Sequence, residues 1–203
     1  GYEWANLYLI ATFPSRHYDI EDYPTVKEYL LSFDMESLEQ TGKKYTIDGQ
    51  QVTARKKTNN KWFETQDSIS YWDDFFKPKI CWKAVGRNLT FAIVEAGTFL
   101  TAPASFIQAG QYNEYIMAFL CSSVGKYFIY QNSDTTGAGD IMLNIQSLIK
   151  FPIPICEAEI QPLSELVKQQ SLDYSSDRQQ LINLWLYKSY GFNSAEIEAI
   201  ENC

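Results

Sequence analysis

The sequence ICWKAVGRNLTFAIV at residues 80–94 decides the fold class of this chain. Its two apolar runs, 80–85 and 91–94, predict β-strands, because aromatic and β-branched side chains suit a pleated, partly buried surface. Gly86-Arg87-Asn88 between the runs predicts a turn. Two more short strands are expected just downstream, at 99–101 and 105–109.

The strongest helical pattern follows at residues 113–130, where apolar side chains recur every three or four residues. Gly125 inside this pattern lowers the helix propensity, or marks a close crossing with another segment. A strand is expected at 141–145, and Pro152 and Pro154 predict an extended segment over 151–155. The apolar face of the expected helix consists of Ile116, Phe119, Leu120, Val124, Tyr127 and Phe128.

Shorter elements are predicted upstream of the strands. The apolar run 6–13 predicts a buried strand that ends at Pro14. Asp48-Gly49 lies between two short apolar stretches, which predicts a β-hairpin. A short helix is expected over 68–76. One further helical face is formed by Val26, Tyr29, Leu30 and Phe33.

After Cys156 no strand pattern remains, and three amphipathic segments near 160–170, 176–190 and 194–201 predict helices. We therefore expect a mixed α+β domain at residues 1–155, followed by a helical appendage at residues 156–203.

The composition excludes several classes of protein. Hydrophobic residues make up 45% of the 203 residues and aromatic residues 15%, which excludes a disordered chain. The four cysteines are widely spaced and there is one histidine, so we expect no structural zinc site and free thiols in a reducing cytoplasm. The apolar run 7–13 is far shorter than the ~20 residues that span a bilayer, so no membrane segment is expected.

Charge is distributed unevenly along the chain. In total, 17 Lys and Arg stand against 25 Asp and Glu, a formal net charge of −8 that by itself argues against binding to nucleic acid. Residues 41–90 hold ten of the basic residues and five of the acidic ones, so this window carries +5 and the remainder carries −13. The basic window is therefore the part of the chain suited to a polyanion.

The densest basic stretch is RKKTNNKW at residues 55–62. Arg can bridge the major-groove edge of guanine, Asn that of adenine, and Lys or Thr can hold phosphate oxygens. We expect a mobile loop with these side chains to contact DNA, and a solvated basic loop without a partner is the alternative. The candidate contacts, with the weaker ones last, are Arg55, Lys56, Lys57, Asn59, Asn60, Lys61, Lys43, Lys44, Thr135 and Thr136.

The sequence contains no recognisable catalytic motif. The nucleophile elbow G-x-S-x-G and the phosphate loop G-x-x-x-x-G-K-[ST] are both absent. Gly137-Ala138-Gly139 predicts a flexible turn, and His17 has no second histidine with which to form a dyad or a metal pair. Adjacent carboxylates at Glu21-Asp22 and Asp73-Asp74 point in different directions, so we interpret them as solvated. We expect a non-catalytic chain without a catalytic residue, metal or cofactor of its own.

Several motifs carry a family resemblance. They are RKKTNNKWFETQ at 55–66, FKPKI-x-W at 76–82, WANLYLIATFP at 4–14, D-x-P-x-V-K-x-Y-L at 22–30, TGAGD at 136–140 and Y-x-x-Y-G-F at 187–192. Together they resemble the TaqI-like C-terminal specificity domain, which is found in type II restriction–modification enzymes that fuse a methyltransferase and a nuclease. The resemblance extends over nearly the whole chain.

The resemblance implies an α+β fold with a mixed or antiparallel curved sheet and packed helices, followed by a helical segment. It also implies a target-recognition domain that holds duplex DNA and reads a short sequence. This domain would direct the methylation and cleavage activities of a larger bacterial, cytoplasmic enzyme of phage defence. Methyltransferase and nuclease domains would then be its protein partners, and they would carry S-adenosylmethionine and Mg²⁺.

Two alternatives stay open. The chain could be a protein–protein docking module of a methylation-based phage-defence complex, with the acidic helices of 156–203 against a methyltransferase neighbour. A small-ligand enzyme is the weaker alternative, because the sequence offers no nucleophile motif, metal cluster or phosphate loop.

Overall fold

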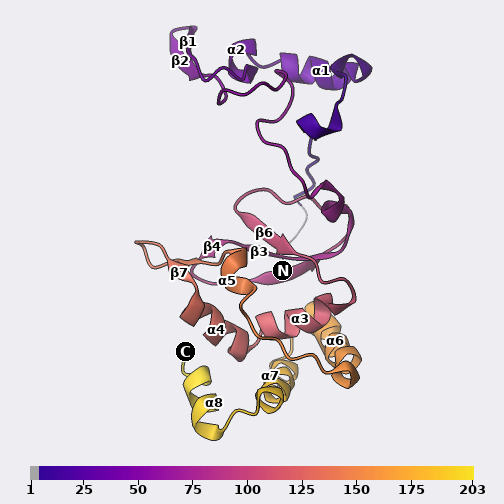
Figure 1. Ribbon diagram of the computed structural model, residues 1–203, viewed down its shortest axis with the longest axis vertical. Coiled ribbons are helices and arrows are strands. Elements are labelled where there is room, and N and C mark those ends of the chain that lie inside the picture. Colours follow the sequence, from indigo (N-terminus) through magenta and orange to yellow (C-terminus); the bar gives the residue numbers. More distant parts are fainter. Residues whose placement is uncertain (1–4) are drawn as a thin grey trace. The chain divides into compact units, whose positions relative to one another are not determined.

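Residues 5–203 are described by the computed structural model, and the chain divides between residues 72 and 73 into two units. We call residues 5–72 the N-terminal unit and residues 73–203 the C-terminal unit. The described residues form eight α-helices and three small antiparallel sheets (Figure 1). The expected α+β class is therefore confirmed, whereas the single curved sheet that the resemblance implies is not.

The N-terminal unit contains one hairpin and several short helices. Helix α1 begins at Pro24, whose fixed φ suits the first turn of a helix, and it buries no side chain. Asp48 and Gly49, with φ of 48° and 81°, form the turn of the hairpin, as expected. The elements are η1 (Pro14–Arg16), η2 (Ile20–Asp22), α1 (Pro24–Leu31), α2 (Met35–Leu38), β1 (Lys44–Ile47) and β2 (Gln50–Thr53).

The buried strand expected at 6–13 is wrong. These residues form no strand, and the side chains of Leu7 and Tyr8 are 76% and 86% exposed. An apolar run supplies the side chains of a strand, but a strand also needs a neighbour to pair with its N–H and C=O groups. In the described part of the N-terminal unit, β1 and β2 pair only with each other.

The C-terminal unit is built on a three-stranded sheet of order β5-β3-β6, with β3 (Lys79–Lys83), β5 (Phe91–Val94) and β6 (Ala104–Ile107). Cys81 on the central strand lies opposite Ala92 on one side and Phe106 on the other. Ile80 and Trp82 face the helices, and the Trp82 indole donates a 3.0 Å hydrogen bond to the carbonyl oxygen of Leu143. Strand β3 is thus the centre of the core.

The other face of β3 buries a lysine. Lys79 is fully buried, and its ammonium donates a 3.0 Å hydrogen bond to the carbonyl oxygen of Phe75. The same oxygen accepts a hydrogen bond from the Gly97 amide. The Phe75 ring stacks on Phe99 and contacts Phe106. Desolvation by these rings lowers the pKa of Lys79.

The single helix expected at 113–130 is two helices, α3 (Asn113–Leu120) and α4 (Ser123–Asn132). Between them Ser122 caps α4, because its hydroxyl accepts a 3.0 Å hydrogen bond from the Gly125 amide. A Cβ atom on Gly125 would lie 2.0 Å from the carbonyl oxygen of Phe119 in α3. Of the two interpretations of Gly125, a close approach to another segment is therefore the one that the structure supports, and it coincides with the break.

Helices α6 (Glu157–Leu172), α7 (Ser176–Tyr190) and α8 (Ser194–Glu201) complete the core of the C-terminal unit. Leu163 and Leu186 are buried in the same cluster as Ile80 and Trp82. The boundary expected at 155/156 therefore differs from the division at 72/73. The bounds expected for α7 and α8 agree with the structure, and Asn193 and Glu196 form a capping box at α8.

The remaining expectations were only partly met. No strand forms at 99–101, the strand expected at 141–145 ends early and is followed by a helix, and the helix expected at 68–76 is a short 3-10 turn. Within residues 5–203, no helix combines the length and the apolar character needed to cross a bilayer. The other elements are η3 (Trp72–Phe76), β4 (Val85–Gly86), η4 (Gly110–Tyr112), β7 (Asp134–Thr135), β8 (Ile141–Met142) and α5 (Ile145–Leu148).

Candidate nucleic-acid interface

The basic loop expected to bind DNA follows the hairpin directly. Residues 54–61 form neither helix nor strand, as their polar sequence predicts. The loop runs beside the segment that precedes β1, because the Gly42 amide donates a 2.8 Å hydrogen bond to the carbonyl oxygen of Arg55. The Ala54 amide likewise donates to the carbonyl oxygen of Lys43 at 2.8 Å. Lys43 and Lys44 are therefore neighbours of the basic loop.

Arg55 points into the protein. Its guanidinium group donates to the carbonyl oxygen of Leu38 at 2.8 Å, to that of Glu64 at 2.9 Å, and to that of Trp62. Desolvation of the half-buried guanidinium lowers the pKa of Arg55. The planar guanidinium group of Arg55 thus binds three carbonyl groups from two segments. The single ammonium group of a lysine is less suited to this arrangement.

Gln40 reinforces the same arrangement from the end of α2. Its buried amide nitrogen donates to the carbonyl oxygens of Glu64 at 2.7 Å and Lys61 at 3.1 Å. Its amide oxygen accepts a 2.5 Å hydrogen bond from the Thr58 hydroxyl, and the Thr58 amide donates to the Gln40 carbonyl at 3.1 Å. Every polar atom of this buried side chain has a partner, which makes the loop rigid at its centre.

Asn60 and Glu64 close the far end of the loop. The side-chain nitrogen of Asn60 donates to the carbonyl oxygens of Thr65 at 2.9 Å and Gln66 at 3.2 Å. The buried carboxylate of Glu64 accepts a 2.7 Å hydrogen bond from the Lys61 amide. We call Gln40, Arg55, Thr58, Asn60 and Glu64 the polar network. It fixes residues 54–66, so the mobile loop expected from the sequence is a braced one.

The outward side chains of the loop are basic. We call the exposed side chains Lys43, Lys44, Lys56, Lys57 and Lys61 the lysine group. The ammonium of Lys61 lies 5.5 Å from the centre of the Phe63 ring, and Lys56 forms an ion pair with Asp67. Asn59 is also exposed, whereas Asn60 is engaged in the network. Of the residues expected to contact DNA, the lysine group and Asn59 are thus accessible, and Arg55 and Asn60 hold the loop from inside.

Positive charge in the N-terminal unit is concentrated in the hairpin and the basic loop. Residues 41–67 carry six basic and three acidic side chains, a net charge of +3, while residues 5–40 carry two basic and seven acidic ones. The basic side chains of the N-terminal unit are therefore concentrated on the hairpin and its loop. A local excess of positive charge of this kind attracts a polyanion even where the whole chain is acidic.

Thr135 and Thr136 belong to the C-terminal unit. Thr135 is exposed at the end of β7, and the Thr136 hydroxyl accepts a 3.0 Å hydrogen bond from the Asp140 amide. Gly139, with φ of 81°, lies in the turn that the sequence predicts at residues 137–139. Asp140 also lies 3.6 Å from the guanidinium of Arg87. These two threonines form a hairpin tip of the C-terminal unit, whereas the polar network belongs to the N-terminal unit.

Four residues of the site were not expected from the sequence: Gln40, Thr58, Glu64 and Asp67. Gln40 contacts residues that are 18 to 24 positions away in the sequence, so no local pattern predicts its role. A signal does exist for Glu64, because an acid three residues after Lys61 is the spacing at which a side chain can reach back to a main-chain amide. No comparable pattern in the sequence indicates that the Arg55 side chain points into the protein.

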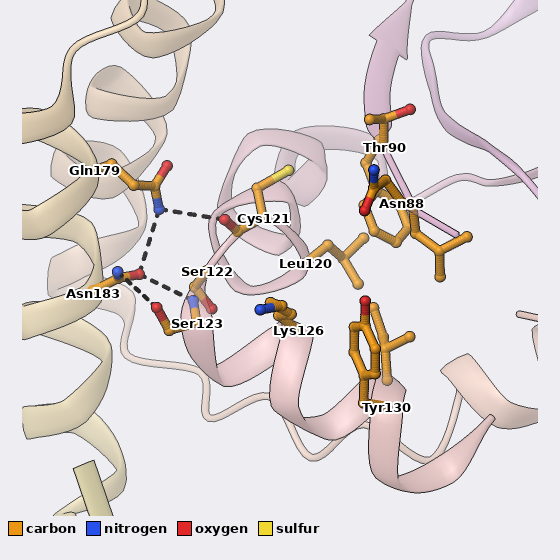
Figure 2. A pocket seen from close by; sticks show the side chains of 13 residues that line it. Asn88, Thr90, Leu120, Cys121, Ser122, Ser123, Lys126, Tyr130, Gln179 and Asn183 are labelled. Atoms are coloured by element: carbon orange, nitrogen blue, oxygen red, sulfur yellow. Dashed lines mark hydrogen bonds between the residues drawn. The ribbon is translucent and has the colours of Figure 1, made fainter. Parts of the chain in front are cut away.

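A concave feature lies on the C-terminal unit, between α7, the α3–α4 turn and residues 88–91, with a volume of about 470 Å³. Figure 2 shows the side chains that line it. Its polar walls are engaged: Asn183 bonds to the amide and hydroxyl of Ser123, and Gln179 donates to the Cys121 carbonyl at 3.3 Å. The Lys126 ammonium donates to the carbonyl oxygen of Cys203 at 3.1 Å. The contacts of Asn183 and Gln179 join α7 to the α3–α4 turn, and the contact of Lys126 joins α4 to the last residue of the chain.

Within residues 5–203, no group of three or more His, Cys, Asp or Glu side chains is arranged to hold a metal ion. The described cysteines are free thiols, of which Cys81 is buried. Comparison with models of protein families finds no match, and comparison with curated proteins finds none either. The resemblance to the TaqI-like specificity domain therefore stays a prediction that rests on the motifs themselves.

Proposed function

We propose that this chain is a sequence-specific recognition module for duplex DNA, which directs the methyltransferase and endonuclease activities of a larger restriction–modification enzyme. In this proposal the chain is not catalytic. S-adenosylmethionine and Mg²⁺ belong to the other domains of the parent enzyme, which are its protein partners in the bacterial cytoplasm.

One observation carries the proposal: the basic loop is braced from inside by Arg55 and presents lysines to solvent. A loop that is ordered before binding loses little conformational entropy when it meets DNA. Lysines suit phosphate oxygens, and an exposed Asn between them suits the edge of adenine. The loop thus combines lysines that can bind phosphates with an asparagine that can recognise a base.

The experiment that tests the proposal is a salt titration of DNA binding. The double variant Lys56→Glu with Lys57→Glu should weaken binding to a short duplex and lower the slope of log K against log[salt] by about one to two units. Lys150→Glu with Lys188→Glu is the matched control, because both lysines are exposed and lie in the C-terminal unit. Equal loss of affinity and slope in the two double variants would contradict the proposal.

The wild-type chain by itself should bind DNA weakly, with a dissociation constant near the non-specific range of ~10⁻⁴–10⁻⁶ M. Other domains of the parent would supply further phosphate contacts. The upstream sequence of the parent gene is the simplest independent check, since a methyltransferase domain should carry the motif N-P-P-[YF].

A second candidate function, a protein–protein docking module, is favoured by the surface of the C-terminal helices. Leu172, Tyr174 and Leu181 are 89%, 72% and 57% exposed. Residues 157–203 also carry eight acidic and three basic side chains. Exposed apolar side chains among acids are typical of an interface with a neighbouring domain.

Deletion of 156–203 is unsuited to test this second function, because Leu163 and Leu186 belong to the core. Leu172→Lys with Leu181→Lys leaves the core intact and is the better test. Loss of assembly with the methyltransferase domain, with DNA affinity unchanged, would support docking. Retained assembly would contradict it.

A further inference from the structure

Lys56 differs from the rest of the lysine group in having a carboxylate partner. Its ammonium forms an ion pair with Asp67, whereas no ion pair within the described residues involves the other four lysines. Lys56 lies near the beginning of the braced loop and Asp67 just beyond its end. The pair therefore closes the loop on its solvent side, opposite the Arg55 guanidinium that holds it from within.

The position of Asp67 is set by the polar network. The Thr65 hydroxyl donates a 2.9 Å hydrogen bond to the carbonyl oxygen of Asp67. Asn60 in turn holds the carbonyl oxygens of Thr65 and Gln66. Three consecutive residues are thus anchored through their main chain, which keeps the Asp67 backbone within side-chain reach of Lys56.

The ion pair is open to displacement. The side chains of Lys56 and Asp67 are 56% and 76% exposed, and an exposed pair contributes no more than about a five-fold change to an equilibrium constant. A phosphate oxygen can therefore take the place of the carboxylate at Lys56. The anchored carboxylate would then face the phosphate at short range, with like charge.

We propose that Asp67 is an intramolecular competitor for Lys56 that weakens the hold of this chain on DNA phosphates. The inference rests on the proposed recognition of DNA and names a regulating residue of that same surface. Asp67 would limit binding that depends on phosphates alone, and it would leave the reading of bases to Asn59 and its neighbours. The competition is electrostatic, so it is strongest at low salt.

The test compares Asp67→Asn with Asp48→Asn in the full chain. Both changes remove one negative charge from the N-terminal unit, and Asn tolerates the left-handed conformation that Asp48 adopts at φ of 48°. Binding to a short duplex of mixed sequence would be measured by fluorescence anisotropy between about 50 and 200 mM salt. Asp67→Asn should tighten binding about two- to five-fold at low salt and steepen the salt slope by about one unit. Asp48→Asn should change both less.

A double-mutant cycle isolates the pair. Lys56→Ala should lower DNA affinity less than Lys57→Ala in the wild-type chain, and as much as Lys57→Ala in the Asp67→Asn background. Two outcomes would overturn the inference and leave DNA recognition in place. In the first, Asp67→Asn raises the affinity for the duplex no more than Asp48→Asn does. In the second, Lys56→Ala lowers the affinity equally in the wild-type and Asp67→Asn backgrounds. If wild type and all variants fail to bind the duplex, both the proposed function and this inference are overturned.

Discussion

A 2.9 Å hydrogen bond joins the guanidinium group of Arg55 to the main-chain carbonyl of Glu64. It connects the two ends of the basic loop through its interior, and the same guanidinium reaches back to Leu38 at the end of α2. Arg55, the most basic residue of the RKKTNNKW stretch, thus stabilises the loop from inside, and the lysines beside it are exposed on the surface.

Arg55→Lys should destabilise the N-terminal unit although it keeps the charge. A single ammonium cannot satisfy the carbonyl groups of Leu38, Trp62 and Glu64 together, and loss of such charge-assisted bonds costs about 2 kcal/mol. Amide hydrogen exchange over residues 54–67 would measure the change. Lys57→Ala is the control and should stay within about 0.5 kcal/mol of wild type. Unchanged protection in Arg55→Lys would show that Arg55 does not brace the loop.

Neighbouring asparagines should respond in different ways. Asn59→Ala should leave stability unchanged and reduce discrimination between duplex sequences by about 1–3 kcal/mol, because an exposed Asn can bridge adenine. Asn60→Ala should instead lower the free energy of unfolding, because two bonds to Thr65 and Gln66 are lost. Selection of bound duplexes from a random pool, together with chemical denaturation, would separate the two effects. Reversed effects would contradict the division into outward and inward residues.

Gly125→Ala should destabilise the C-terminal unit strongly. The added Cβ would lie 2.0 Å from the Phe119 carbonyl oxygen, so α4 would have to move away from the end of α3. Overpacking against the main chain costs about 3 kcal/mol or more. Gly137→Ala is the control, because nothing lies within 4 Å of the position its Cβ would take. Thermal unfolding would measure both, and equal midpoints would contradict the crossing.

Lys79→Met should stabilise the C-terminal unit near neutral pH. The buried ammonium is removed, the apolar stem is kept, and the Phe75 carbonyl still accepts from the Gly97 amide. Relief of desolvation is worth on the order of 1 kcal/mol. Lower stability in the variant would show that the ammonium is needed in the core.

The pH dependence of that difference follows from the lowered pKa of Lys79. The unfolded chain binds the proton up to the ordinary pKa of 10.5, whereas the folded chain releases it earlier. Between the two pKa values the wild type therefore gains stability as pH rises. The advantage of Lys79→Met should shrink as pH approaches 10.5. Burial raises the pKa of Tyr115 and Tyr187, which gives the opposite pH dependence, but this contribution is common to both chains and cancels in their difference.

Local sequence signals predicted much of the fold. Asp48-Gly49 specified its hairpin, and the amphipathic segments at 176–190 and 194–201 form α7 and α8, which Ser175 and Asn193 cap in the structure. These features depend on contacts within a few residues, and a sequence displays such contacts directly.

Features that depend on distant partners were missed. The apolar pattern of 113–130 continues through the α3–α4 break, because both helices face one core, so periodicity could not locate the break. The run 6–13 has the composition of a strand, but its residues do not join a sheet of the described structure. Residue chemistry placed the basic window at 41–90 and its densest stretch at 55–62, but only the packing of Gln40 and Glu64 shows that Arg55 turns inward.

The central claim is that duplex DNA lies against the lysine group. Its most direct test is the acetylation rate of each lysine in the chain, measured by mass spectrometry with and without a saturating short duplex. We expect the duplex to protect Lys43, Lys44, Lys57 and Lys61, while Lys150 and Lys188 react as before. Equal reactivity of the lysine group with and without DNA, or protection of Lys150 and Lys188 instead, would contradict it.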